Sequence, residues 1–194
     1  MPAHPALASE TAVRAYVSTQ LAAAVSEPRH GWHWPSLTTG GDSRVVVLRG
    51  VREGGSQVTW YTDRRSDKVA QLREDHRCVL LFYHGDHRTQ LRLYGEAEEE
   101  RDGATRRRLW AGVSSGAKSN YVTASAPGTP LPDGRAATDL PDAWPKLTPV
   151  QEARAFAHFA VYRTYVSRAD FLQLLDEGAY RSQWSAGGFA FVTP

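Results

Sequence analysis

Short segments rich in β-branched and aromatic residues, separated by turns, are the feature that most constrains how this chain folds. Such segments predict β-strands, and the brief connections between them favour antiparallel pairing. Several antiparallel strands with helices at their edges are typical of a closed or split barrel. The sequence therefore predicts a mainly β fold, a β-barrel with peripheral helices. The predicted strands are 36–39, 44–51, 57–61, 77–83, 88–97, 155–166, 171–175, 179–184 and 189–193.

Three helices are predicted around these strands. Ser9 can cap a helix that runs to about residue 24, Ser66 can cap one that runs to about 74, and a third spans about 102–112. The segment 125–149 holds six of the 11 prolines, which predicts a long irregular loop. We interpret residues 1–194 as a single domain that contains this loop.

Composition limits the classes of function. With 194 residues, 23% charged residues, a mean hydropathy of -0.47 and a net charge of +2, the chain resembles an ordinary globular protein. No apolar run approaches the roughly 20 residues of a membrane helix, and the start lacks the pattern of a signal peptide. A lone cysteine, Cys78, cannot form an internal disulfide. We expect a cytoplasmic protein with neither nucleic acid nor membrane as its partner.

Cationic side chains stand at the edges of the predicted strands. Arg44 and Arg49 flank one strand, and Ser66 and Lys68 begin the helix that follows another. Guanidinium groups, an ammonium group and free helix N–H groups are what a bound phosphate needs. A solvated, charged loop is the alternative interpretation of the turn after residue 61. Within that turn, Arg64 and Arg65 are expected to be exposed charges.

Four motifs in this order resemble a known signature. They are Arg-x-Val-x-Leu-Arg at 44–49, Tyr-Thr-Asp at 61–63, Ser-x-Lys at 66–68 and Gln-x-Arg-x-x-Gly at 90–95. Together they resemble the FMN-binding signature of the pyridoxamine 5′-phosphate oxidase family. More narrowly, the chain is similar to a divergent branch of oxidase-related FMN-binding proteins. The resemblance covers about residues 30–185 and implies an FMN-binding split barrel, antiparallel, that forms a homodimer with FMN in the groove between the subunits.

The resemblance also implies which residues bind the cofactor. Arg44, Ser66 and Lys68 match phosphate contacts, and Gln90 matches an amide at the isoalloxazine edge. The family's later tryptophan falls at Leu172. The substrate-handling Arg-x-His-x-Arg pattern survives only as Arg181, so the catalytic residues stay unassigned. The full cofactor-binding set is Arg44, Val45, Val46, Val47, Leu48, Arg49, Tyr61, Thr62, Ser66, Asp67, Lys68, Gln90, Ser125 and Arg181.

These residues predict an FMN-dependent oxidoreductase that acts on an unidentified small molecule. The substrate phosphate cluster of the oxidase is reduced here to Arg108, so we expect little oxidation of pyridoxamine 5′-phosphate. A non-catalytic flavin- or haem-binding protein on the same barrel is the alternative. Gly-x-Ser-x-Gly at 112–116 matches a hydrolase elbow, but it follows a predicted helix instead of a strand. His84, Asp86 and His87 are better explained by a hairpin turn, and no metal is expected.

Overall fold

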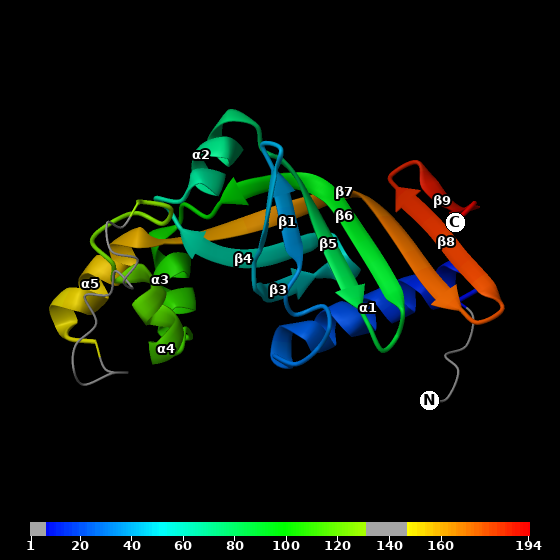
Figure 1. Cartoon of the computed structure of the whole chain (residues 1–194), viewed down its shortest axis with the longest axis horizontal. Helices are drawn as coiled ribbons and strands as arrows, with labels where there is room; N and C mark the ends of the chain where they lie inside the picture. Colours follow the sequence, from blue (N-terminus) through cyan, green and yellow to red (C-terminus); the bar gives the residue numbers. More distant parts are fainter. Residues whose placement is uncertain (1–6, 131–146) are drawn as a thin grey trace.

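The longest strand, β7 (Phe159–Leu175), organises the sheet (Figure 1). The computed structural model describes residues 7–130 and 147–194. β7 pairs with β6 along most of its length, with β4 in its first half and with β8 in its second half. Every strand pair among the described residues is antiparallel. The remaining strands are β1 (Ser36–Thr39), β2 (Asp42–Val45), β3 (Leu48–Arg52), β4 (Gln57–Asp63), β5 (Arg77–His84), β6 (Thr89–Glu99), β8 (Gly178–Ser185) and β9 (Gly188–Val192).

One extended segment closes the barrel. The strand order is β2-β1-β5-β6-β7-β4-β3, so β2 and β3 are at opposite ends of it, yet only Val46 and Val47 separate them in the chain. The backbone stays extended between them, because the Val46 N–H donates to Pro35 O and the Leu48 N–H to His33 O, both at 2.9 Å. The predicted mainly β split barrel is confirmed. The prediction of a single strand over 44–51 is corrected, because this segment changes partner from β1 to β4.

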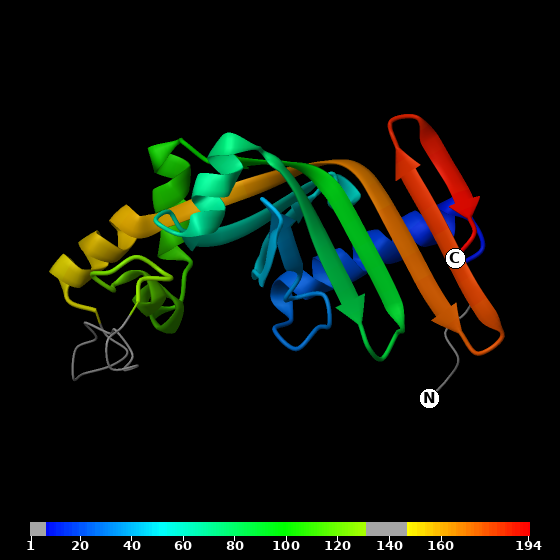
Figure 2. The ribbon, with the colours of Figure 1, turned by 45° about the horizontal axis from the view of Figure 1, so that its top comes forward.

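The helices lie on two sides of the sheet (Figure 2). α1 packs its buried residues Val13, Val17 and Leu21 on the core, and the Ser9 side chain caps it, accepting from Ala12 N–H. The helices are α1 (Glu10–Ser26), α2 (Asp67–Glu74), α3 (Gly103–Ala111), α4 (Ser115–Lys118) and α5 (Pro149–His158), with the 3-10 turns η1 (Glu53–Gly55) and η2 (Ser119–Tyr121). α2 forms the connection between β4 and β5, and α3, α4 and α5 lie at the end of the sheet away from β8 and β9 (Figure 1). No helix in the described part of the chain is both long and apolar enough to cross a membrane.

The buried residues form two clusters. The larger fills the barrel and includes Trp32, Trp60 and Phe82. The smaller lies between α3, η2, α5 and the start of β7, around Trp110 and Phe159. Tyr61 and Tyr121 pack against this smaller cluster. It therefore supports one wall of the site described below.

The start of β7 differs from the sequence prediction. Residues 155–158 were predicted as strand but belong to α5, whose capping box joins Thr148 and Gln151 around Pro149. These signals begin the helix at Pro149. The helix continues to His158, and its buried Ala155 and half-buried Phe156 pack in the smaller cluster. The predicted loop 125–149 therefore ends at Thr148, and its residues 131–146 lie outside the described part of the chain.

Candidate functional site

A cavity of about 200 Å³ lies between the 45–49 segment, β4, α2 and the α4–η2 turn. Half of the predicted cofactor residues line it, and they come from three separate segments of the chain. Tertiary folding thus brings together the motifs at 44–49, 61–63 and 66–68. The lining residues are Val45, Val46, Val47, Arg49, Tyr61, Thr62, Lys68, Val113, Ala117, Asn120 and Tyr121.

One region of the cavity surrounds Lys68 at the start of α2. Its ammonium Nζ donates to Thr62 Oγ1 at 3.1 Å and to Ser66 Oγ at 3.3 Å. Ser66 is the N-cap residue, but its hydroxyl donates to Asp63 O at 2.7 Å and does not cap the helix. Burial lowers the pKa of Lys68, and the nearby positive charge of Arg44 lowers it further. A half-buried ammonium, two hydroxyls and an uncapped helix start form a binding region for an anion.

A second region surrounds Arg49. Strand alternation places Arg49 on the same side as Val45 and Val47, and a register shift between Leu48 and Gly50 makes Arg49 the extra residue of a bulge. Its guanidinium carbon lies 5.8 Å from the centre of the Tyr61 ring. Arg49 has no hydrogen-bond or ion-pair partner among the residues described. It therefore presents an uncompensated positive charge to the cavity.

Two tyrosines accompany Arg49. Burial raises the pKa of Tyr61, against the opposing effect of Arg49 and Arg108. Burial raises the pKa of Tyr121 to about 12, again against the effect of Arg49. Both phenols are thus protonated at neutral pH, when they can donate hydrogen bonds.

Arg44 does not line the cavity. It points towards α2, where its guanidinium donates to Gln71 Oε1 at 3.0 Å and forms an ion pair with Asp42. Its charge still acts on Lys68, so it lies behind the Lys68 region. Leu48 is fully buried in the core, while Ser66 and Asp67 flank Lys68 without lining the cavity.

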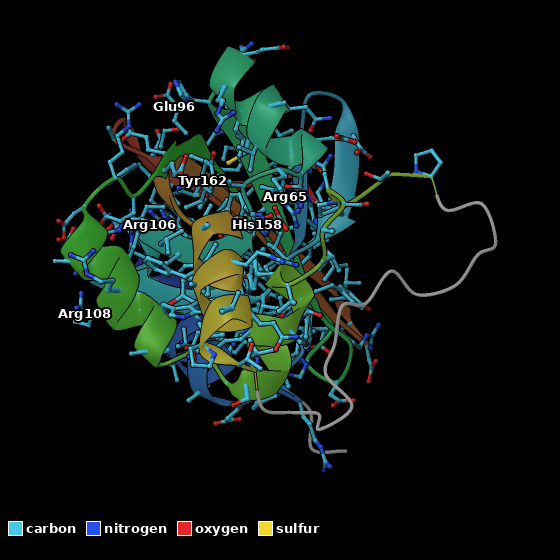
Figure 3. The ribbon with its side chains drawn as sticks, turned by 90° about the vertical axis from the view of Figure 1, so that its left-hand side faces the viewer. Arg65, Glu96, Arg106, Arg108, His158 and Tyr162 are labelled. Atoms are coloured by element: carbon cyan, nitrogen blue, oxygen red, sulfur yellow. The ribbon has the colours of Figure 1, made fainter. Side chains whose placement is uncertain are left out.

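Arg64 and Arg65 are not exposed turn charges, and this expectation was wrong. Arg65 donates through Nη2 to Asp63 Oδ2 at 2.7 Å, and the Asp63 side chain is only 6% exposed. Arg65 Nη1 also donates to Thr123 O and Ala124 O at 2.9 and 3.0 Å. It thereby fastens the segment that contains Ser125 beside the start of α2; Figure 3 shows Arg65 at this end of the molecule. Arg64 in turn pairs with Glu99.

Gln90 and Arg181 lie on another surface of the chain. Register pairs Tyr83 with Gln90, Gln90 with Leu172, and Leu172 with Arg181, so these residues form one row across β5, β6, β7 and β8. Neither Gln90 nor Arg181 lines the cavity of its own chain. The Arg181 guanidinium donates to Asp170, which is 1% exposed, at 3.2 Å from Nε and 2.9 Å from Nη2.

Sequence reasoning missed four lining residues, which are Val113, Ala117, Asn120 and Tyr121. They lie on α4, on η2 and on the connection between α3 and α4, where no sequence periodicity marks a site. One signal in the sequence could have indicated them: Tyr121-Val122-Thr123 is similar to the divergent branch of the family, although this similarity implies no role for Tyr121. The Gly-x-Ser-x-Gly pattern at 112–116 also falls here; it follows α3 and ends inside α4, so the strand that must precede a hydrolase elbow is replaced by a helix.

The arginines of α3 do not supply a second cationic cluster to this cavity. Arg106 donates to Phe156 O and Phe159 O at 3.3 and 2.7 Å, which fastens α3 to the α5–β7 junction. Figure 3 shows Arg106 between α3 and α5, with Arg108 on the outer side of α3. Neither residue lines the cavity.

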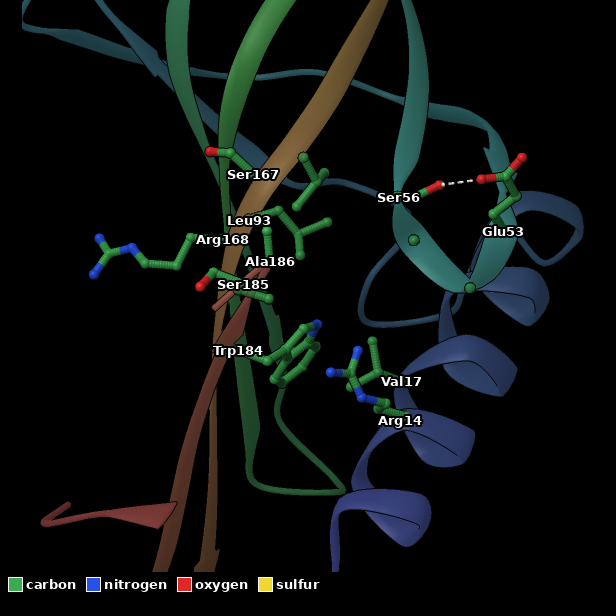
Figure 4. A pocket seen from close by; sticks show the side chains of 14 residues that line it. Arg14, Val17, Glu53, Ser56, Leu93, Ser167, Arg168, Trp184, Ser185 and Ala186 are labelled. Atoms are coloured by element: carbon green, nitrogen blue, oxygen red, sulfur yellow. Dashed lines mark hydrogen bonds between the residues drawn. The ribbon is translucent and has the colours of Figure 1, made fainter. Parts of the chain in front are cut away.

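A separate cavity of about 210 Å³ lies between α1, η1 and the β7–β8 pair (Figure 4). Its charged lining residues Arg14 and Glu53 already have partners: Arg14 pairs with Glu10, outside the lining, and lies over the Trp184 ring, and Glu53 accepts from the Ser56 hydroxyl. Arg168 points away from this cavity (Figure 4). We therefore place the candidate site in the cavity around Lys68 and Arg49. Within the described ranges, no group of His, Cys, Asp or Glu side chains could hold a metal ion.

Comparison with known proteins gives a family match to part of the chain. Residues 6–99 match the family described as pyridoxamine 5′-phosphate oxidase, FMN-binding domain. A pyridoxine/pyridoxamine 5′-phosphate oxidase of Deinococcus deserti is 36% identical over 55 residues, which is 28% of this chain and 25% of that protein. The alignment thus spans only about a quarter of that relative.

Solved structures share the fold over nearly the whole chain. A pyridoxamine 5′-phosphate oxidase-related, FMN-binding protein of Nostoc punctiforme superposes with a TM-score of 0.70 at 19% identity, covering 98% of this chain and 100% of that one. PhzG of Burkholderia lata, solved in complex with tetrahydrophenazine-1-carboxylic acid, superposes with a TM-score of 0.66 at 17% identity, covering 98% of this chain and 94% of that one. The resemblance seen in the motifs is confirmed to this extent: residues 6–99 match the FMN-binding domain of the pyridoxamine 5′-phosphate oxidase family, and the chain has the split-barrel fold of these solved structures.

Proposed function

We propose that this protein binds FMN non-covalently in the cavity around Lys68 and Arg49 and acts as an FMN-dependent oxidoreductase. The observation that carries the proposal is the convergence, in one cavity, of Lys68, Thr62 and an apolar strand surface. These groups come from the motifs at 44–49, 61–63 and 66–68. No acidic side chain is among the residues that line this cavity, so an anionic ligand meets no fixed negative charge there.

The donor set fits the chemistry of FMN. Lys68 and the hydroxyls of Thr62 and Ser66 would hold the phosphate at the start of α2. Val45 and Val47 would provide apolar surface for the isoalloxazine ring. Bound FMN supplies hydride transfer. The chain's own groups would bind and orient the flavin.

A homodimer would complete this site. Val45 and Leu81 are both register partners of Ser36, and they are 62% and 37% exposed on the same face of the sheet. Tyr83, which is 55% exposed, continues this face to the row that contains Gln90 and Arg181. An exposed apolar surface next to an open cavity is typical of an interface. A twofold contact here would place the Gln90 and Arg181 of one subunit against the other subunit.

Pyridoxamine 5′-phosphate is not expected to be a good substrate. It would need donors for a second dianionic phosphate, and Arg106 is already bonded to backbone carbonyls while Arg108 does not line the cavity. Assay of the FMN-loaded protein under air should give little pyridoxal 5′-phosphate. Turnover of about 1 s⁻¹ or faster, the range of ordinary enzymes, would contradict this expectation.

Titration with FMN and with riboflavin tests the proposal. FMN should bind with a perturbed visible spectrum, and riboflavin at least about ten-fold more weakly, because it lacks the phosphate that Lys68 would contact. Equal affinity for the two flavins would mean that Lys68 does not contact the phosphate. If neither flavin bound, the proposed function would be refuted. Uptake of haem with a Soret band, in place of flavin, would favour the haem-binding alternative.

A further inference from the structure

The cavity has one cation from α2, Lys68, and a second from the 45–49 segment, Arg49, and each has its own neighbours. The charges that shift the pKa of Lys68 are Arg44 and nearby aspartates. Arg49 instead acts on the two tyrosines, Tyr61 and Tyr121. If the first region holds the FMN phosphate, the second has a cation left for another ligand. This step rests on the proposed function.

The composition of the second region favours a single negative charge. Arg49 is its only cationic lining residue, since the other lining cation, Lys68, belongs to the first region. A guanidinium pairs with a carboxylate through two parallel hydrogen bonds, and its single positive charge balances the single negative charge of the carboxylate. A phosphate dianion would leave a second charge uncompensated.

The neutral groups of this region fit a carboxylate with an apolar body. Tyr121 and Asn120 can donate hydrogen bonds to its oxygens, and Val113 and Ala117 offer apolar surface beside them. The Tyr121 hydroxyl has no hydrogen-bond partner among the described residues. Its ring is fixed by edge contacts with Trp110 and Phe159, with centres 5.8 and 5.5 Å apart. The ring is thus held in place, and within the described part of the chain its hydroxyl is left available to donate to a ligand.

We propose that Arg49, Tyr61 and Tyr121 form a subsite for the carboxylate of a small organic acid, and that Tyr121 is a specificity-determining residue. The substrate, or the product, of this protein is then a carboxylic acid with an apolar body. A substrate phosphate is disfavoured by the same subsite.

The test uses the FMN-loaded full chain and three probes that share one ring: benzoate, phenyl phosphate and benzamide. Binding is followed by the change in the flavin spectrum and by calorimetry. Benzoate should bind at least about ten-fold more tightly than phenyl phosphate or benzamide. Tyr121→Phe should weaken benzoate about ten-fold, because one hydrogen bond to a charged group is lost, and should leave FMN affinity within about two-fold.

Tyr165→Phe is the matched control. Tyr165 is an exposed β7 tyrosine that does not line the cavity, so its variant should bind benzoate like the parent. Equal affinities for the three probes, or unchanged benzoate affinity in Tyr121→Phe, would overturn the subsite while leaving FMN binding standing. Failure of the parent chain to bind FMN would overturn the proposed function and the subsite together.

Discussion

Replacing Lys68 with alanine should weaken FMN binding selectively. The half-buried ammonium lies within hydrogen-bond distance of Thr62 and Ser66, in the region assigned to the phosphate. A hydrogen bond to a charged group contributes about 1.5–3 kcal/mol, so the dissociation constant should rise about ten- to hundred-fold. The fold should tolerate the change, because the Thr62 and Ser66 hydroxyls are already 3.3 Å apart and can bond to each other.

The same lysine predicts how FMN affinity depends on pH. Burial and Arg44 lower the pKa of Lys68 below its ordinary 10.5, and a bound phosphate favours the protonated form. Affinity should therefore fall as pH rises through the lowered pKa of the free protein, since the ammonium is lost there. Lys68→Arg should remove this alkaline loss, because a guanidinium stays protonated.

Fluorescence titration of FMN at several pH values measures both effects. Arg73→Ala is the control, because Arg73 is an exposed cation on the same helix, α2, and does not line the cavity. A Lys68→Ala variant that binds FMN no more weakly than Arg73→Ala would refute the placement of the phosphate. If the Lys68→Arg variant still lost FMN affinity at alkaline pH, the group that titrates would be one other than Lys68.

Three further variants test the interface, the bulge and the buried ion pair. Leu81→Asp should shift the protein towards monomer in sedimentation velocity, because a charge would enter the exposed apolar face. Gly95→Ala should lower the free energy of unfolding by about 3 kcal/mol, because its Cβ would overlap the carbonyl oxygen of Tyr165 at the β6–β7 bulge. Arg65→Ala should cost about 3 kcal/mol in urea unfolding, because it leaves a buried carboxylate unpaired.

Each of these variants has a control of similar chemistry. Val150→Asp changes an apolar residue that is 73% exposed on α5, and it should leave the sedimentation coefficient unchanged. Gly187→Ala adds a Cβ at a position without positive φ, where the nearest atom is 3.5 Å away, and should be nearly neutral. Arg52→Ala removes an exposed arginine for which no ion pair is found among the described residues. Equal effects of variant and control would refute the corresponding argument.

The elements could be predicted from the sequence because their signals are local. Ser9 begins α1, Asp102 begins α3, and the predicted strand and turn segments reappear as β4, β5, β6, β8 and β9 within a few residues. The exception is informative. Phe156 suits the predicted strand, but the Thr148 capping box, with Pro149 and Gln151, begins a helix that continues through 155–158.

The candidate site was predicted only in part, for a geometric reason. Motif order indicated the phosphate groups around Lys68, and Arg44 and Arg49 were predicted at the two ends of one strand, on opposite sides if the side chains alternate. Which side faces a cavity depends on the partner of each strand, and the sequence does not encode that locally. The structure turns Arg44 towards Gln71 and leaves Arg49 facing Tyr61.

The strand pattern, the helix starts and the family resemblance could be predicted because all three are properties of neighbouring residues. The composition of the cavity could not, because it depends on how distant segments pack together. Tertiary folding brought Tyr121 and Asn120 beside Arg49, and it used Arg65 to fasten the segment at 123–124. It also carried Gln90 and Arg181 to a separate face, because cross-strand register places them in a row that the cavity of the same chain does not reach.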